Sequence, residues 1–575
     1  MTLATLDYIL IISFFLVSLA VGIWVSKSSG KDTKSFFLSS RNMPWWLLGV
    51  SMVATTFAAD TPNLVAGIVR EDGVYGNWVW WSFLLTGMLT VFFYARLWRK
   101  SGVTTDLEFY ELRYSGKPAA FLRGFRAIYL GVFFNIVIMA NVCLAAVKIG
   151  HVMFGFSPQQ TLLIASIVTV LYAALGGLRG VLITDFIQFI IAMVGSIWAA
   201  FYIINLPEVG GIKNILNTPS LADKTNIFPD FSQPEVYIPL LIVPLAVQWW
   251  SVWYPGAEPG GGGYIAQRML AAKNEKHATG AVLFFNFAHY ALRPWPWIII
   301  GLASLIVFPN LESLQAAFPN LDAGYVKNDL SYPAMLTFLP AGLLGIVITS
   351  LIAAFMSTIS THLNWGSSYV VNDFYKRFIK PDASEKELVL TGRISTFIMM
   401  VLAALLALVL EEAKEAFDLL LQIGAGTGLL FILRWFWKRI NPYSEIAAMI
   451  ISFAIALIFF IDGKQTQPFF IIAGHWKLVL GVVVTTLGWV LVTLLTRPSN
   501  RETIIDFNQL IFEGDSKFKG FRYKIGAFIC GIIGVYAALF ATGFYIYGNY
   551  THASLLTGVV IITSFFLIRL WRKVF

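Results

Sequence analysis

The sequence predicts an all-α integral membrane protein with about fifteen transmembrane helices. Apolar residues make up 57% of the 575 residues and charged residues 13%, whereas a soluble domain has about 45–50% apolar and about 25% charged residues. Several separate apolar runs reach about 20 residues, the length that crosses a bilayer as a helix. The runs are continuously apolar rather than alternating, which favours helices over a β-barrel.

The expected spans follow one another along the chain. The first, from about Leu6 to Val25, has no basic leader and no small-residue cleavage site, so we expect a retained helix rather than a signal peptide. Cys143 and Cys530 fall inside apolar runs without metal-ligand neighbours, which is typical of packing residues. The spans are centred near residues 15, 56, 88, 135, 167, 192, 248, 294, 346, 401, 427, 454, 486, 535 and 562.

The basic residues lie between the spans in an asymmetric pattern. The net charge is +9, and clusters of Lys and Arg occupy residues 27–41, 96–126, 376–393 and 497–524. With the N-terminus outside, most of the 41 Lys and Arg fall on the inner side, as the positive-inside rule requires. The clusters therefore indicate topology, and we expect neither a nucleic-acid partner nor an obligate protein partner. We predict a multi-pass protein of the cell membrane whose C-terminus is cytoplasmic.

Two expected spans contain residues that interrupt a helix. The second contains the run 58–63, with Asp60 and Pro62, and the seventh contains 254–263, with two prolines and five glycines. Non-helical backbone at this depth survives only inside protein or beside a cavity. The breaks lie five spans apart, so their two sets of helices have opposite orientation, an arrangement that indicates a transport site at the midplane. The alternative is that one break is a long loop between two short helices.

Several segments in order along the chain carry a family resemblance. They are Met43–Ala54, Tyr172–Gln188, Tyr264–Lys273, Ala354–Thr361 and Asn372–Tyr375. Together they resemble the sodium/solute symporter family, which includes the sodium/glucose cotransporters, and the bacterial sodium/galactose carriers in particular. The resemblance implies a leucine-transporter-type fold, with ten core helices in two inverted five-helix repeats and extra flanking helices. We therefore expect one membrane domain with a leading helix (1–30), two repeats (44–204 and 236–437) and additional C-terminal helices (444–575).

The same resemblance implies a sodium site built from oxygen atoms, the ligands that a hard cation prefers. Its ligands would be main-chain carbonyls of one helix and hydroxyls of another, without a carboxylate. By themselves, adjacent hydroxyls in an apolar helix more often bond back to the preceding turn. The implied ligands are the carbonyls of Ala54, Phe57 and Ala354 and the hydroxyls of Ser357 and Thr358.

Some family members bind a second sodium ion, and matching residues occur here. Ser360 and Thr361 lie one turn beyond Ser357. Asp185, Ser357, Ser360 and Thr361 together form a possible second site, which would make the coupling ions one or two sodium ions. Asp185 could instead be a waystation for sodium leaving inward.

Polar and aromatic residues near the two breaks are the candidates for binding the solute. Aromatic faces with a few acids and amides suit sugar hydroxyls. Asp60 could instead cap a half-helix, and Arg293 could anchor at the interface, pair with Glu258 or bind a substrate carboxylate. The candidates are Asp60, Trp250, Trp253, Glu258, His289, Arg293 and Gln422.

These observations predict a sodium-coupled secondary active symporter that imports a small polar solute, with a sugar or sugar derivative as the leading candidate. A carrier of an organic or sugar acid, or a solute sensor of the same fold, remains open. An enzyme is not expected, because the histidines have no metal spacing and no nucleophile motif appears. The glycine-rich run 424–428 lies within a span and lacks the Lys-Ser or Lys-Thr of a phosphate loop.

Overall fold

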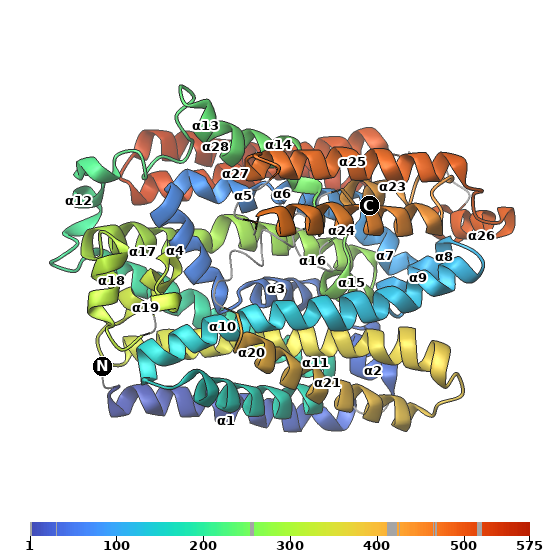
Figure 1. Cartoon of the computed structure of the whole chain (residues 1–575), viewed down its shortest axis with the longest axis horizontal. Helices are drawn as coiled ribbons and strands as arrows, with labels where there is room; N and C mark the ends of the chain where they lie inside the picture. Colours follow the sequence, from blue (N-terminus) through green and yellow to red (C-terminus); the bar gives the residue numbers. More distant parts are fainter. Residues whose placement is uncertain are drawn as a thin grey trace.

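The computed structural model describes residues 3–29, 32–252, 258–321, 323–410, 423–424, 426–463, 465, 469–513 and 520–574. Throughout these ranges the regular elements are helices, and Met43 and Ala272 form an isolated parallel bridge. The long helices run along one common direction, with shorter helices at both ends (Figure 1). This arrangement confirms the all-α prediction.

The helices fall into three consecutive groups. The first is α1 (Thr5–Ser29), α2 (Thr33–Leu38), α3 (Trp45–Thr56), α4 (Asp60–Asp72), α5 (Trp78–Trp81), α6 (Leu84–Leu89), α7 (Ala95–Ser101), α8 (Phe109–Arg113), α9 (Lys117–Ile128), α10 (Asn135–Phe154) and α11 (Pro158–Ile204). The second is α12 (Gly211–Asn217), α13 (Pro234–Tyr237), α14 (Val243–Ala246), α15 (Gly263–Ala271), α16 (Glu275–Phe287), α17 (Pro294–Val307), α18 (Leu311–Ala317), α19 (Ser331–Leu336), α20 (Leu343–Ser368) and α21 (Glu385–Ala407). The third is α23 (Gly428–Leu433), α24 (Pro442–Gly463), α25 (Gly474–Leu495), α26 (Arg501–Phe512), α27 (Phe521–Ile546) and α28 (Tyr550–Val574).

Eleven helices of the described chain are long and apolar enough to cross a membrane, or twelve if the bent pair α3–α4 is one span. In the span made of α20 and its continuation η12 (Tyr369–Ile379), 89% of an apolar 18-residue stretch is buried, whereas the share in α28 is 11%. The expected span near residue 167 is the first part of α11, which changes direction at Gly177. There φ is 54°, a backbone conformation that glycine adopts without steric cost. The expected spans near residues 248 and 427 include residues outside the described ranges, so the count of about fifteen stays a prediction.

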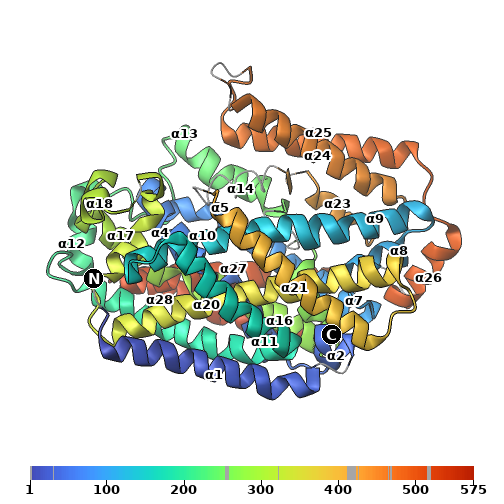
Figure 2. The ribbon, with the colours of Figure 1, turned by 60° about the horizontal axis from the view of Figure 1, so that its bottom comes forward.

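The two ends of the molecule differ in their short elements. The N-terminus, α12 and α18 lie at one end, and α2, α8 and α26 lie at the other (Figures 1 and 2). The segments that hold α12 and α18 are thus on the same side as the N-terminus. Between the ends, α20 packs against α11, and α3 packs against both α11 and α16. The helix pair α24–α25 lies at the edge of the bundle, as Figure 2 shows.

Candidate cation and solute site

The helix α3–α4 is interrupted in the middle of the bundle, as the sequence predicts. Helix α3 ends at Thr56, α4 begins at Asp60, and the two segments are bent by 57°. The Phe57 amide donates to the carbonyls of Val53 (2.9 Å) and Ala54 (3.1 Å). Pro62 lies in the first turn of α4, where it removes no helical hydrogen bond. Because the helical ladder stops here, the carbonyls of Thr55 and Thr56 accept from side-chain hydroxyls instead of the amides that a continuous helix would supply.

A second interruption precedes α15. The described residues between Trp250 and Gly263 are not helical, and Gly260 (φ 87°) and Gly261 (φ 91°) adopt conformations that favour glycine. The Trp253 prediction falls in the range 253–257, and the Gln422 prediction in the range 411–422; both lie outside the described residues.

Thr358 joins α20 to the broken end of α3. Its Oγ1 donates to the carbonyl oxygen of Thr55 at 2.9 Å, and the Oγ1 atoms of Thr55 and Thr361 are 3.1 Å apart. The carbonyl of Ala54 is adjacent in α3, and that of Ala354 is one turn earlier in α20. The structure therefore brings together the two helices that carry the expected sodium ligands. Each of these residues is between 1% and 3% exposed: Ala54, Phe57, Ala354, Ser357 and Thr358.

A buried carboxylate lies beside this contact. The Asp185 carboxylate accepts hydrogen bonds from Ser357 Oγ (2.6 Å) and Ser51 Oγ (2.5 Å), and it is fully buried in α11. Arg268, also fully buried, donates to Thr361 Oγ1 at 2.7 Å and to Ser51 Oγ at 3.2 Å. Asp185, Ser357 and Thr361 thus belong to one cluster. In contrast, the Ser360 hydroxyl bonds back to the Ser357 carbonyl at 3.1 Å. Sequence reasoning missed the participation of Ser51 and Arg268, although both lie in the segments that carry the family resemblance.

A cavity of about 540 Å³ adjoins the contact between α3 and α20. It extends from Thr55 and Thr358 toward the end of the molecule that holds α18, where Leu311 and Asp329 line it. Of the solute-binding candidates it includes Asp60, His289 and Arg293. Trp250 lies elsewhere, packed near Leu478 and Val482 of α25.

Three polar side chains form a closed triangle in the cavity wall. His289 Nδ1 is 3.0 Å from Thr56 Oγ1, and His289 Nε2 is 3.3 Å from Arg293 Nη2. The third side is Arg293 Nη1, which donates to Thr56 Oγ1 at 3.3 Å. The triangle ties the end of α3 to the turn η9 (Ala288–Leu292) that precedes α17.

Other polar residues of the cavity were not predicted. Asn63 lies one turn after Asp60, and both its side-chain oxygen and its nitrogen are buried without a hydrogen-bond partner. Asn141 lies on α10, and Lys148, two turns further along, pairs with Asp329 at 2.7 Å. A lysine and an asparagine seven residues apart in an apolar helix are the signal that could have identified this face.

Glu258 does not line the cavity. Its carboxylate is 3.3 Å from Arg126 Nη2, and Arg126 Nη1 is 3.3 Å from Glu445 of α24. Glu445 also lies 3.6 Å from Arg434, and all four side chains are at most 5% exposed. Glu258 therefore pairs with Arg126 in a buried ionic cluster rather than with Arg293.

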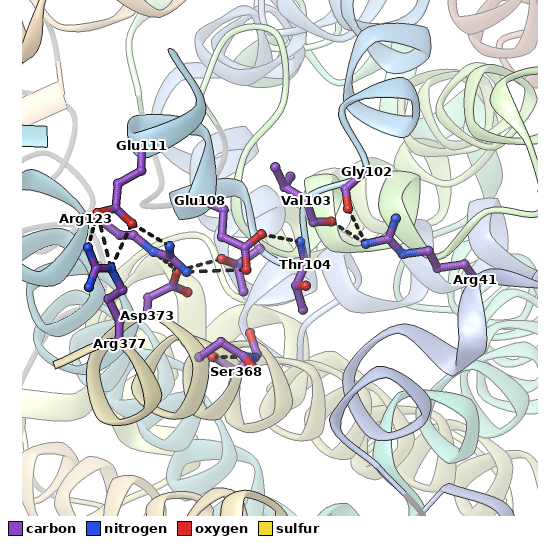
Figure 3. A network of polar contacts seen from close by, with 12 residues as sticks. Arg41, Gly102, Val103, Thr104, Glu108, Glu111, Arg123, Ser368, Asp373 and Arg377 are labelled. Atoms are coloured by element: carbon purple, nitrogen blue, oxygen red, sulfur yellow. Dashed lines mark hydrogen bonds and ion pairs between the residues drawn. The ribbon is translucent and has the colours of Figure 1, made fainter. Parts of the chain in front are cut away.

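A second ionic network lies at the end of the molecule opposite α18. Figure 3 shows Arg123 of α9 between three carboxylates. Its Nε is 2.7 Å from Asp373, its Nη1 is 2.8 Å from Glu111, and its Nη2 is 3.4 Å from Glu108. Asp373 is fully buried in η12, the continuation of the helix that carries Ser357 and Thr358. The network thus fixes the end of that helix against α8 and α9.

The fold and the site together indicate a class of protein. Two interrupted helices beside a cavity that reaches one end of the molecule are features of a membrane transporter. The sequence profile of the "Sodium:solute symporter family" matches residues 36–452. The chain belongs to that family, and its relatives are transporters rather than enzymes.

Two relatives and one solved structure illustrate the similarity. The chain is 25% identical over 473 residues to a "Sodium/glucose cotransporter" of Vibrio parahaemolyticus, covering 79% of this chain and 85% of that protein. It is 26% identical over 497 residues to "Sodium/myo-inositol cotransporter 2" of Mus musculus, covering 80% and 71%. The structure of a Na+-coupled sialic acid symporter, in a substrate-bound outward-open state, has a TM-score of 0.68 at 22% identity. It covers 86% of this chain and 99% of that one, and this likeness confirms the leucine-transporter-type fold.

Proposed function

We propose that this protein is a secondary active symporter that uses sodium to import a small polyhydroxylated solute, a sugar or sugar derivative. The observation that carries the proposal is the hydrogen bond from Thr358 to the carbonyl of Thr55. It holds hydroxyls of α20 against the C-terminal carbonyls of α3, beside a cavity of about 540 Å³. Oxygen atoms of both helices are then available to a sodium ion beside the cavity in which a solute would bind.

The proposed sodium site has five oxygen ligands, and Asp185 belongs to a possible second site. Sodium bound between α3 and α20 would hold the two helices together while the cavity is open toward α18. The solute then binds, and the helices rock so that the opposite end opens. The membrane potential supplies about 2.3 kcal/mol per charge per 100 mV. The five ligands are the carbonyls of Ala54, Phe57 and Ala354 and the hydroxyls of Ser357 and Thr358.

The proposal includes a topology. We assign two inverted repeats to residues 44–204 and 236–437, with 1–30 before them and 444–575 after them, in one membrane domain. The end with the N-terminus and α18 faces outward, and the C-terminus is cytoplasmic in the plasma membrane. In this orientation the cavity is open outward and the ionic network around Arg123 lies on the inner side.

Uptake by proteoliposomes tests the proposal. We expect the purified protein to accumulate a radiolabelled sugar or sugar derivative when a sodium gradient points inward, and to lose accumulation when potassium replaces sodium. Unchanged accumulation in potassium would contradict the proposal. The alternative of a solute sensor predicts binding without solute counterflow in the same liposomes, and a carrier predicts counterflow.

The sodium dependence of uptake tests the second site. If two sodium ions are coupled, the Hill coefficient of wild type is about two, and Asp185→Asn is expected to lower it to about one. The reason is that Asp185 is the one carboxylate proposed for that site, with Ser357 already bonded to it. Ser360→Ala is a milder test of the same site. A matched control is Ser196→Ala, also in α11, whose hydroxyl bonds back to Ala192. A wild-type coefficient of about one that Ser360→Ala leaves unchanged would remove the second site.

A further inference from the structure

The cavity wall contains a buried cation whose contacts are with uncharged groups. Arg293 is 1% exposed and donates to Thr56 Oγ1, to the carbonyl of Val53 (3.5 Å) and to His289. Its guanidinium also lies 5.3 Å from the centre of the Trp297 ring. None of these groups carries a negative charge. Within the described ranges, Arg293 has no carboxylate at ion-pair distance.

His289 cannot supply the missing charge. Its Nε2 faces the guanidinium, which can only donate, so Nε2 must accept and carries no proton. Its Nδ1 then carries the proton and donates to Thr56 Oγ1, whose own hydroxyl donates to main-chain carbonyls of α3. The three hydrogen bonds of the triangle therefore form with a neutral imidazole. The positive charge of Arg293 therefore stays uncompensated by the triangle.

The guanidinium also retains unused donor capacity. Its Nε is buried without a hydrogen-bond partner in the described structure. Burying a cation is costly unless an anion and hydrogen-bond acceptors face it. A carboxylate meets both needs, because its two oxygens match the planar donors of a guanidinium.

Asp60 of the same cavity interacts with Arg293 electrostatically, but the described structure has no ion pair between them. Asp60 lines the cavity, and its Oδ1 is buried without a partner. Asn63, one turn along α4 and 2% exposed, has an unpartnered amide oxygen and nitrogen, and Asn141 Oδ1 across the cavity is also unpartnered. These groups offer acceptors and a donor for hydroxyls. The aromatic side chains of Trp80 and Tyr290 complete a wall suited to a sugar-like body.

We propose that the solute is a polyhydroxylated carboxylic acid, whose carboxylate binds Arg293 and whose hydroxyl groups bind Asp60 and Asn63. This assignment rests on the proposed transport function and specifies the substrate class of the same cavity. A neutral sugar would leave the Arg293 guanidinium without a carboxylate at ion-pair distance. A simple aliphatic acid would leave Asp60 and Asn63 without donors or acceptors. A small amino acid could bridge Asp60 and Arg293 but would leave the amides of Asn63 and Asn141 unused.

Binding of matched solute pairs to the full-length protein in detergent tests the assignment. The pairs are D-galacturonate with D-galactose and D-gluconate with D-sorbitol, measured calorimetrically in sodium and in potassium. We expect each acid to bind at least about tenfold more tightly than its neutral partner, the effect of one charge-assisted interaction. Arg293→Gln should weaken acid binding about 10- to 100-fold and leave the neutral partner within about threefold. Arg293→Lys should retain part of the preference, because it keeps the charge without the planar donors.

Two other variants separate the roles of the cavity groups. Asp60→Asn should weaken both members of a pair, because it changes the hydroxyl side of the site. Arg70→Gln is the matched control. Arg70 is a buried arginine at the other end of α4 that donates to Ser304 and does not line the cavity, so the acid preference should not change.

Each remaining outcome has a defined meaning. Equal or tighter binding of the neutral sugars, failure of every acid to bind, tighter binding of serine or alanine, or an unchanged acid preference in Arg293→Gln would overturn the assignment. Acid binding that is the same in sodium and potassium would uphold it and would instead contradict sodium coupling. If only the neutral sugars bind, and only in sodium, the substrate assignment would be overturned and sodium coupling would be supported.

Discussion

Thr358→Ala is expected to raise the sodium concentration for half-maximal uptake by about 10- to 100-fold. The side chain is 3% exposed, and its Oγ1 joins α20 to the Thr55 carbonyl, next to the proposed ligand Ala54. Removing it deletes one of five proposed sodium ligands and one of the direct hydrogen bonds between the two helices. An interaction with a charged group contributes about 1.5–3 kcal/mol. The initial rate of uptake at fixed solute and increasing sodium measures the effect.

Thr349→Ala provides the matched control for this variant. Thr349 lies on the same helix and is similarly buried, but its hydroxyl bonds back to Gly345. It is therefore expected to leave the sodium requirement within about twofold of wild type. A Thr358→Ala protein with wild-type sodium dependence, or with the same change as Thr349→Ala, would show that these hydroxyls only pack α20.

The interruption of α3–α4 could be predicted because its cause is local. Asp60 and Pro62 lie within three residues of each other in an otherwise apolar span, and both suit the start of a helix. The direction change in α11 at Gly177 depends on a single φ angle that no periodic pattern shows. The meeting of α3 with α20 joins residues 303 apart in the chain, and it was expected through the family resemblance rather than from spacing.

The residues around the solute cavity were harder to predict, because their contacts also join segments that are distant in the chain. Glu258 is close to a break in the sequence, yet its partner Arg126 is 132 residues away, so their pairing depends on how α9 packs. The roles of Asn63 and Asn141 follow from which buried atoms lack a partner, and this is a property of the assembled cavity. Such polar residues can be recognised one by one in the sequence of a membrane helix. The sequence does not show which side of the helix faces the cavity.

Arg123→Gln is expected to shift the protein toward the state that is open at the end opposite α18. The substitution leaves the fully buried Asp373 without its ion-pair partner, while Thr105 still donates to it. Removing one partner of a buried ion pair costs about 3–5 kcal/mol. This free energy corresponds to at least about a 100-fold change in a conformational equilibrium. Because η12 continues α20, release of its end should also weaken the proposed sodium site, which favours the outward-open state.

A cysteine introduced at Ser368 can report this shift. Ser368 is 2% exposed beside the network in Figure 3, and the native Cys143 and Cys530 can be replaced by alanine. We expect a water-soluble maleimide to label S368C much faster in the Arg123→Gln background, and sodium to slow that labelling. Arg377→Gln is the control, because Arg377 pairs with the same Glu111 through a side chain that is 45% exposed, and exposed pairs contribute about 0–1 kcal/mol. If Arg123→Gln destabilises the protein in detergent, the Arg123→Gln/Asp373→Asn double variant removes the unpaired charge but still lacks the ion pair. Equal labelling in the Arg123 and Arg377 variants, or in the double variant and wild type, would mean that this network does not hold the inner end closed.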